Sequence, residues 1–232
     1  MNKRHIVFLT GAGISAESGI PTFRDSNGMW GKYDAMKLAS IEGFREKPQA
    51  VLDFYNARRK NLLEVEPNHA HRVLAELENE YDVTIVTQNV DNLHERAGSS
   101  RIIHLHGELS KVTSSRNKLL PDNIKEYPLD VPIRLGDKAA DGSQLRPYIV
   151  WFGEYVDKMD EAEYWVKQAD IFVVIGTSLV VYPAAGLVDY APKGIPKYLI
   201  DPNEMEGGLP IGFQHIKAKA VQGIDRLVKE LS

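Results

Sequence analysis

The sequence predicts an α/β protein: a Rossmann-like parallel sheet with helices on both faces, and a small domain made of two insertions. An apolar run rich in branched residues, 6–10, leads directly into two glycines, Gly11 and Gly13. Several later apolar runs also end in polar or glycine-rich clusters. Between these runs lie two long stretches, 32–79 and 109–146, that do not read as buried strands.

The first strand and its turn have a chemical use. Glycine lets a backbone approach a pyrophosphate closely, and the N-terminus of the following helix offers free N–H groups. The pattern Gly11-x-Gly13-x-x-Ala16 is a degenerate dinucleotide fingerprint, so a tight strand-to-helix turn without a ligand remains an alternative. A dehydrogenase of this fold would need a second strand ending in an acidic residue about twenty positions further on. Residues 29–36 have no strand character, which disfavours hydride transfer.

The composition sets limits on the function. The chain has 232 residues, 43% of them apolar, a formal net charge of −4 and a pI near 6.0, so nothing in its charge favours nucleic-acid binding. No apolar run approaches about 18 residues, and the first strand follows the N-terminus at once, so we expect a cytoplasmic protein without a membrane segment. Cysteine is absent, which excludes disulfides, thiolate nucleophiles and cysteine-ligated metals.

The first insertion is predicted to be helical. Residues 46–63 form a helix with Pro48 in its first turn, and a second helix follows over 67–77. Tyr55 and Arg58 stand three residues apart on the first helix, so they can point at one spot. From the residues alone, positions 58–60 also fit a solvated basic face.

The sheet continues with strands over 81–87, 101–105, 169–175 and 196–200, and a closing helix covers 223–231. Because parallel strands place their carboxyl ends at one edge, the clusters that follow them should converge on one nucleotide crevice. These clusters begin at Gly11, Gln88, His106, Gly176 and Asp201. We therefore assign 1–31, 80–108 and 147–232 to a nucleotide-binding domain, and 32–79 with the loop-rich 109–146 to the small domain.

Ordered motifs over most of the chain resemble the sirtuins, a family of NAD-consuming protein-lysine deacylases. The residues that carry this resemblance are 11–15 with 19–25, Gln88-Asn89-Val90-Asp91 with Leu93-His94, His104-Leu105-His106-Gly107, 150–154, 176–184 and Asp201-Pro202-Asn203. The resemblance implies that NAD is the co-substrate and that acylated-lysine proteins are the partners. Nicotinamide, free lysine and O-acyl-ADP-ribose would be the products.

The resemblance also implies residue roles. His106 would be the general base on a ribose hydroxyl, and Asn89 would hold the ribose and a water. The implied cofactor-binding residues are Gly11, Ala12, Gly13, Ile14, Ser15, Phe23, Arg24, Asp25, Gln88, Asn89, Asp91, Gly176, Thr177, Ser178, Asn203 and Ala220. The implied substrate residues are Ala39, Tyr55, Arg58, Val150, Trp151, Phe152, Gly153 and Glu154.

Three of these substrate residues indicate the acyl group. Tyr55 and Arg58 resemble a Tyr-x-x-Arg pair of the sirtuin subgroup that removes succinyl and malonyl groups, and Ala39 matches a small residue that leaves its pocket roomy. A guanidinium binds a carboxylate through two hydrogen bonds. We therefore expect a preference for acidic acyl chains, with acetyl-lysine as a secondary substrate.

The chain departs from the family in its second insertion, where sirtuins usually carry two cysteine pairs around a structural zinc. Residues 107–146 contain neither Cys nor His, so we expect no zinc and no other metal site. Either apolar residues hold this module instead, or the module is partly mobile. The apolar residues are Leu119, Leu120, Ile124, Tyr127, Leu129, Val131, Ile133 and Leu135.

Other interpretations stay open at this point. His104 is predicted to be structural, capping or surface roles are expected for His69, His71 and His94, and Asp91 alone could cap a helix. The alternative functions are a protein ADP-ribosyltransferase, a dehydrogenase and a non-catalytic NAD-sensing module.

Overall fold

The computed structural model describes residues 3–22, 35–205 and 207–231. Its main feature is a parallel six-stranded sheet in the order β3-β2-β1-β7-β8-β9. The strands are β1 (His5–Thr10), β2 (Asp82–Thr87), β3 (Ile102–His104), β7 (Ile171–Ile175), β8 (Lys197–Ile200) and β9 (Phe213–Ile216). The predicted parallel α/β fold is confirmed, with β9 as an additional strand that the sequence analysis missed.

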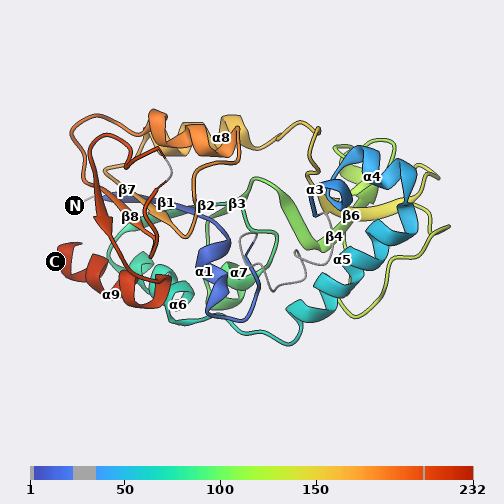
Figure 1. Cartoon of the computed structure of the whole chain (residues 1–232), viewed down its shortest axis with the longest axis horizontal. Helices are drawn as coiled ribbons and strands as arrows, with labels where there is room; N and C mark the ends of the chain where they lie inside the picture. The colour runs from blue at the N-terminus through green and yellow to red at the C-terminus, as the bar shows by residue number, and fades with distance from the viewer. Residues whose placement is uncertain (1–2, 23–34, 206, 232) are drawn as a thin grey trace.

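Helices cover both faces of this sheet. In Figure 1, α8 lies on one side of the sheet, and α6 and α9 lie on the other. The helices are α1 (Ala12–Ala16), α3 (Ala35–Leu38), α4 (Ile41–Glu46), α5 (Pro48–Leu62), α6 (His69–Glu76), α7 (Leu93–Ala97), α8 (Met159–Lys167) and α9 (Ala220–Leu231), with short 3₁₀ turns at Leu77–Asn79, Pro121–Asn123 and Ala184–Tyr190. In the part of the chain that the structure describes, no helix combines the length and apolarity needed to cross a bilayer.

Strand β1 shows why the strands of this sheet appear in the sequence as continuous apolar runs. Ile6 and Phe8 point into the core beneath α6 and α9, whereas Val7 and Leu9 point into the core beneath α8. Because successive side chains of a strand alternate between faces, a sheet covered on both sides needs apolar residues at every position.

The strand order locates the crevice. After β1 the chain builds β2 and β3 on one side, and it later returns to place β7 on the other side of β1. Ligands of open α/β sheets bind at such a switch point, outside the carboxyl ends of the strands. The candidate site is therefore expected where β1 and β7 end.

A second, antiparallel sheet has the order β5-β4-β6 and lies beside α3, α4 and α5 (Figure 1). Its strands are β4 (Gly107–Ser114), β5 (Lys125–Glu126) and β6 (Leu145–Ile149). The stretch predicted to be loop-rich thus contributes strands, because cross-strand pairing stabilises polar segments with little apolar periodicity. The two-domain division of the chain remains our proposal.

Half of the apolar residues expected to hold this module contribute to its packing: Ile133 is buried, and Ile124, Tyr127 and Leu129 are partly buried. Leu119, Leu120, Val131 and Leu135 are exposed, and of the eight expected residues only Ile133 is fully buried. Ile133 packs with Leu52 of α5 and with Val112, Ala139 and Leu145. The small sheet is therefore anchored to α5 by a few side chains.

Arg59 of α5 adds a polar anchor. Its side chain is fully buried and donates hydrogen bonds to the carbonyls of Leu109 and Pro128, the latter at 2.6 Å. The solvated basic face considered for residues 58–60 is wrong for Arg59. A guanidinium can serve several carbonyls that a loop leaves without strand partners.

A polar cluster holds the far end of the module. The Ser114 hydroxyl donates to the Asp141 carboxylate at 2.6 Å, and the Ser143 hydroxyl donates to the other carboxylate oxygen at 2.7 Å. The backbone N–H groups of Arg116 and Asn117 donate to Ser114 Oγ at 3.0 and 3.1 Å. This cluster, centred on Ser114 and Asp141, ties the end of β4 to the segment that leads into β6.

Asp141→Asn should destabilise the protein at neutral pH more than in acid. Its hydrogen bonds from Ser114 and Ser143 lower the pKa of Asp141 from 3.8 to about 2. The stabilisation is therefore complete above about pH 4 and is lost as the pH falls toward 2, where the carboxyl group is protonated. Thermal unfolding at pH 7, 4 and 3 should show a difference between wild type and variant that shrinks with acid.

The control for this prediction is Asp122→Asn, which changes an exposed carboxylate of the same module. It should leave the unfolding temperature unchanged throughout. A loss of stability in Asp141→Asn that is equal at all three pH values would contradict the assignment.

Candidate active site

The carboxyl ends of β1 and β7 are in direct backbone contact. The Gly13 N–H donates to the Gly176 carbonyl at 2.8 Å, and a Cβ on Gly13 would lie 2.6 Å from Gly176 Cα. A Cβ on Gly11 would lie 2.6 Å from Thr177 Cβ. Only glycine permits this approach, so the structure brings together two of the predicted cofactor-binding segments, 11–15 and 176–178.

Gln88 and Asn89, which follow β2, connect the two turns. The Gln88 amide donates to Thr177 Oγ1 at 3.0 Å. The Asn89 amide donates to the Gly11 carbonyl at 3.1 Å and to Ser15 Oγ at 3.2 Å. Polar side chains from three strand ends therefore meet at the switch point.

Asp91 lies buried next to this group. One of its carboxylate oxygens accepts from Ser15 Oγ at 3.0 Å, and the other accepts from the Leu93 N–H at the start of α7 at 3.1 Å. Asp91 thus lies at the start of a helix, as expected if it caps that helix. It also belongs to the crevice. Burial raises the pKa of its carboxyl group, although both hydrogen bonds oppose the shift.

His106 lies in the turn between β3 and β4. Its Nδ1 donates to the Gln88 carbonyl at 3.0 Å, which selects the Nδ1–H tautomer and leaves the lone pair on Nε2. Burial lowers the pKa of His106, so the ring is neutral near pH 7 and can accept a proton. Gly107 has φ +81°, and a Cβ there would collide with the Tyr148 carbonyl oxygen. The glycine after His106 therefore has a steric cause.

The other histidines lie in different settings. His94 is fully buried and hydrogen-bonds with Thr10 Oγ1 at 3.1 Å, so the expected surface or capping role is wrong for it. His71 takes part in a capping box with Asn68, and His69 pairs with Asp225 at 2.8 Å on the surface. The sequence offers no signal for the burial of His94, because its helix is only five residues long.

A cluster of aromatic and basic side chains lies beside the crevice. Arg58 Cζ lies 6.0 Å from the centre of the Tyr55 ring, and the Tyr55 and Trp151 rings are 6.3 Å apart. Ala39 is buried in the same cluster, and its carbonyl accepts from the Phe152 N–H at 2.8 Å. The residues predicted to bind the acyl group are therefore neighbours. Burial raises the pKa of Tyr55 to about 12, so its phenol stays a proton donor.

A small cavity lies between Asp91 of the crevice and this group of side chains, which we call the Tyr55–Arg58 cluster. Arg58 and Asp91 both line it. The remaining lining residues are Ile20, Pro21, Asn61, Leu62 and Leu109.

The segment 150–154 is braced by an arginine that the sequence analysis missed. Arg146 binds Glu154 through two hydrogen bonds of 2.7 and 3.0 Å, and its guanidinium lies 3.3 Å from the centre of the Trp151 ring. Burial alone would raise the pKa of Glu154, but Arg146 brings it below its usual value. An arginine within the otherwise apolar strand β6 was the signal available.

The remaining predicted site residues are dispersed. Asn203 follows β8 and its amide donates to Asp201 Oδ1, whereas Ala220 is buried at the start of α9 after β9. Both follow the carboxyl edge of the sheet. Val150 is partly buried, and Phe152 and Gly153 are exposed. Phe23, Arg24 and Asp25 lie outside the described residues.

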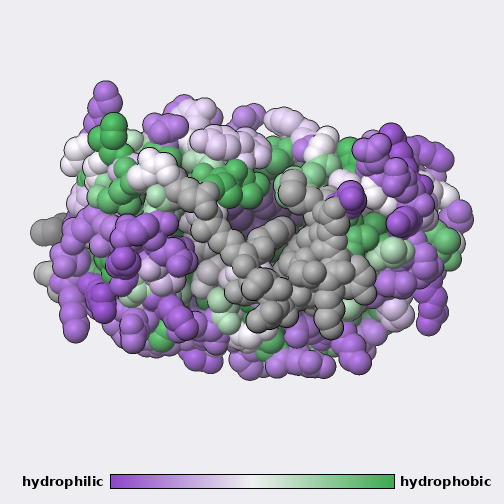
Figure 2. Space-filling view, viewed as in Figure 1, coloured by the Kyte–Doolittle hydropathy of each residue, from purple (hydrophilic) through white to green (hydrophobic). Residues whose placement is uncertain are grey.

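Hydrophilic residues dominate the rim of the face seen in Figure 2, and a hydrophobic patch lies near its middle, below α8 in this view. Polar side chains converge at the switch-point crevice, and the Tyr55–Arg58 cluster lies next to it. These features are typical of an α/β nucleotide-binding protein, and here a neutral histidine lies beside the crevice.

Comparison with known proteins identifies the family. The model of the Sir2 family matches residues 11–183, and the chain belongs to the Sir2 family. It is 55% identical over 225 residues to the NAD-dependent protein deacylase of Bacteroides thetaiotaomicron, covering 97% of this chain and 96% of that protein. It is 53% identical over 228 residues to the NAD-dependent protein deacylase of Helicobacter pylori, with 98% and 97% covered.

Solved structures agree with this assignment. The chain superposes on a Sir2 homolog in complex with NAD with a TM-score of 0.87 at 39% identity, covering 99% of this chain and 90% of that one. It also superposes on Sir2Tm bound to a propionylated peptide with a TM-score of 0.78 at 30% identity, covering 98% and 93%. The crevice described above therefore lies in a fold that binds NAD in the Sir2 homolog.

Proposed function

We propose that this protein is an NAD-dependent protein-lysine deacylase that prefers succinyl and malonyl groups and also removes acetyl groups. Two observations support the activity: the chain belongs to the Sir2 family, and two relatives that are more than 50% identical to it are named NAD-dependent protein deacylase. The observation that carries the acyl preference is the position of the Arg58 guanidinium beside the Tyr55 phenol.

In the proposed reaction NAD is consumed as co-substrate: the amide oxygen of the acyl-lysine displaces nicotinamide from the ribose carbon and forms an imidate. His106 Nε2 accepts the proton of a ribose hydroxyl, so that the sugar oxygen attacks the imidate carbon, and addition of water then releases free lysine and O-acyl-ADP-ribose. Asn89 and Gln88 hold the ribose, and Asp91 binds the nicotinamide amide. The amides of Asn89 and Gln88 are already oriented by the Gly11 carbonyl and Thr177 Oγ1, which reduces the reorganisation needed on binding.

The acyl preference rests on charge. Burial lowers the pKa of Arg58, but an arginine guanidinium keeps its proton at neutral pH. A half-buried cation with a neutral phenol beside it favours a carboxylate at the end of the acyl chain over a methyl group. The Arg146–Glu154 pair supports this preference by holding Trp151 against the same cluster.

We also propose that the small module works without zinc. The hydrogen bonds around Ser114 and Asp141 connect segments that are distant in sequence, as a structural metal would. A cytoplasmic location and the absence of nucleic-acid and membrane partners remain part of the proposal, based on composition.

The direct test is mass spectrometry of the chelator-treated protein with NAD and matched succinyl-lysine and acetyl-lysine peptides. We expect NAD-dependent loss of the succinyl group together with an equal amount of O-succinyl-ADP-ribose. Transfer of ADP-ribose to protein with both peptides intact would identify a transferase. Intact NAD with every peptide would indicate a sensing module. A loss of activity that zinc restores would contradict the zinc-free module.

Arg58→Met should lower kcat/KM for the succinyl peptide about a hundredfold and for the acetyl peptide no more than about threefold, because only the succinyl carboxylate loses an ion pair. Steady-state kinetics on the two peptides measures the ratio. Lys60→Met is the matched control, since Lys60 is exposed on the same helix. Equal losses on both peptides would argue against a carboxylate clamp.

The pH profile should report the lowered pKa of His106. A general base must be unprotonated, and burial shifts the pKa of His106 below 6.5. The acid limb of single-turnover deacylation should therefore have its midpoint below pH 6.5. A midpoint above pH 7 for this acid limb would rule out the assignment of His106 as the base.

A further inference from the structure

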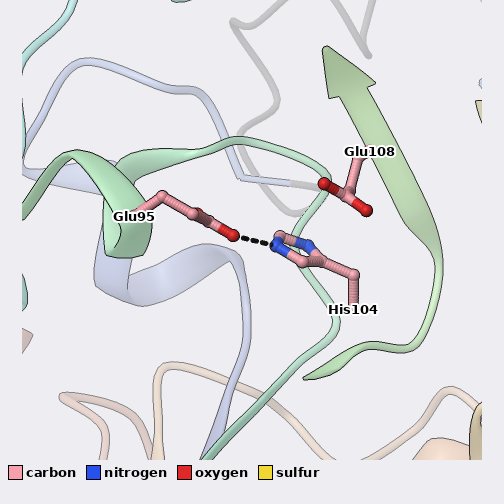
Figure 3. A group of neighbouring side chains, drawn as sticks. All are labelled: Glu95, His104 and Glu108. Atoms are coloured by element: carbon pink, nitrogen blue, oxygen red, sulfur yellow. Dashed lines mark hydrogen bonds and ion pairs between the residues drawn. The ribbon is translucent and has the colours of Figure 1, made fainter. Parts of the chain in front are cut away.

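A second histidine, His104, lies between two carboxylates next to the crevice. Figure 3 shows Glu95 of α7 on one side of the His104 ring and Glu108 of β4 on the other. His104 Nε2 donates to Glu95 at 2.7 Å, and Glu108 is paired with Lys111 at 2.7 Å. The His104 side chain is only 7% exposed, so this charged group is largely shielded from water.

The other ring nitrogen of His104 reaches the catalytic loop. Its Nδ1 lies 3.0 Å from the Asn89 carbonyl oxygen. A backbone carbonyl and a carboxylate are both acceptors, so both ring nitrogens must donate. The hydrogen-bond partners therefore require the doubly protonated imidazolium form of His104.

His104 and His106 act on consecutive residues of one loop. His106 Nδ1 donates to the Gln88 carbonyl, and His104 Nδ1 donates to the Asn89 carbonyl. The side chains of these two residues are the ones that line the crevice. The orientation of that loop therefore depends on two histidines that leave β3 in succession.

We propose that His104 is a positioning residue for the deacylation reaction: paired with Glu95, it is held as a cation that fixes the Asn89 carbonyl and so the Asn89 side chain. This inference rests on the proposed function. His104 does not touch the reacting atoms, and it acts through Asn89.

Loss of the proton would break this arrangement. Glu95 would retain the hydrogen on Nε2, and the Nδ1 lone pair would then face the Asn89 carbonyl oxygen. Two acceptors repel each other at hydrogen-bond distance, so the loop would lose its anchor. Activity should therefore fall when His104 deprotonates in alkaline solution.

The charges around His104 determine the pH at which its ring loses the proton. Burial lowers the pKa of His104, but Glu95 and Glu108 more than compensate, so the pKa is raised. Asp91 and His94 also interact with the charged ring.

The same three side chains also carry ligand groups that metal ions bind. Among the described residues, Glu95, His104 and Glu108 form a group whose ligand atoms all lie within 4.8 Å of one another. A cation there would have to displace the proton from Nε2 and break two existing ion pairs. The present contacts favour the positioning role, and metal dependence is an outcome of the test.

Two isosteric variants separate the bonds of His104. In His104→Asn the side-chain amide can occupy the Nδ1 position and donate to the Asn89 carbonyl. In His104→Gln the amide can occupy the Nε2 position and donate to Glu95. We expect kcat for deacylation to fall about tenfold or more in His104→Gln and to stay within about threefold of wild type in His104→Asn, with KM for NAD nearly unchanged in both.

Glu95→Gln tests the charge and remains informative if the histidine variants fold poorly, because Glu95 is 39% exposed. The Gln amide can donate to the neutral Nε2, which keeps the hydrogen on Nδ1 and the bond to Asn89. The alkaline decline in wild-type kcat should therefore disappear in Glu95→Gln. His69→Gln is the control, since it changes an exposed histidine–carboxylate pair that contacts neither His104 nor Asn89.

Several outcomes would overturn the inference. Equal kcat losses in His104→Asn and His104→Gln, or an alkaline limb that persists in Glu95→Gln, would reduce His104 to a structural residue. Chelator-sensitive wild-type activity that a divalent cation other than zinc restores would assign the three side chains to a metal. If the wild-type protein deacylates no peptide, the proposed function fails, and this inference fails with it.

Discussion

The contact between the Gly13 and Gly176 backbones is the constraint on which the site depends. It joins the carboxyl ends of β1 and β7 at the point where the strand order reverses, and it leaves no room for a Cβ on either side. Because the two turns are held this closely, Gln88 and Asn89 can bridge them with their side-chain amides. A nucleotide crevice built in this way has polar walls that are oriented before any ligand enters.

The turn from β3 to β4 links the large sheet to the small one. His104 ends β3 and Gly107 begins β4, so both histidines of this turn lie at the junction of the two sheets. On the far side of the junction, the buried arginines Arg59 and Arg146 hold α5 and the 150–154 segment. The terminal nitrogens of each guanidinium donate to carbonyls or to a carboxylate, which offsets part of the cost of burying the charge. The Tyr55–Arg58 cluster is thereby held in place relative to His106.

Local sequence patterns were enough to predict much of the fold. Hydrophobic periodicity and turn-forming residues predict the apolar strands, the glycine turn and the helices near 48–62 and 69–76. The structure has these elements close to the predicted bounds. The pairing of Tyr55 with Arg58 follows from helix geometry alone. The strands of the small sheet and β9 were missed, because their residues alternate poorly and are stabilised by partners distant in sequence.

The sequence by itself determined the parallel sheet, the edge at which its ligand site forms and the chemical types gathered there. It did so because strand burial, helix periodicity and glycine turns are local properties of the chain. Only the tertiary structure decided that Arg59 is buried rather than solvated, that His94 lies in the core and that the His104 ring lies between a carboxylate and a backbone carbonyl. Those properties depend on which acceptors and charges lie within a few ångströms, and the residues that supply them are separated along the chain.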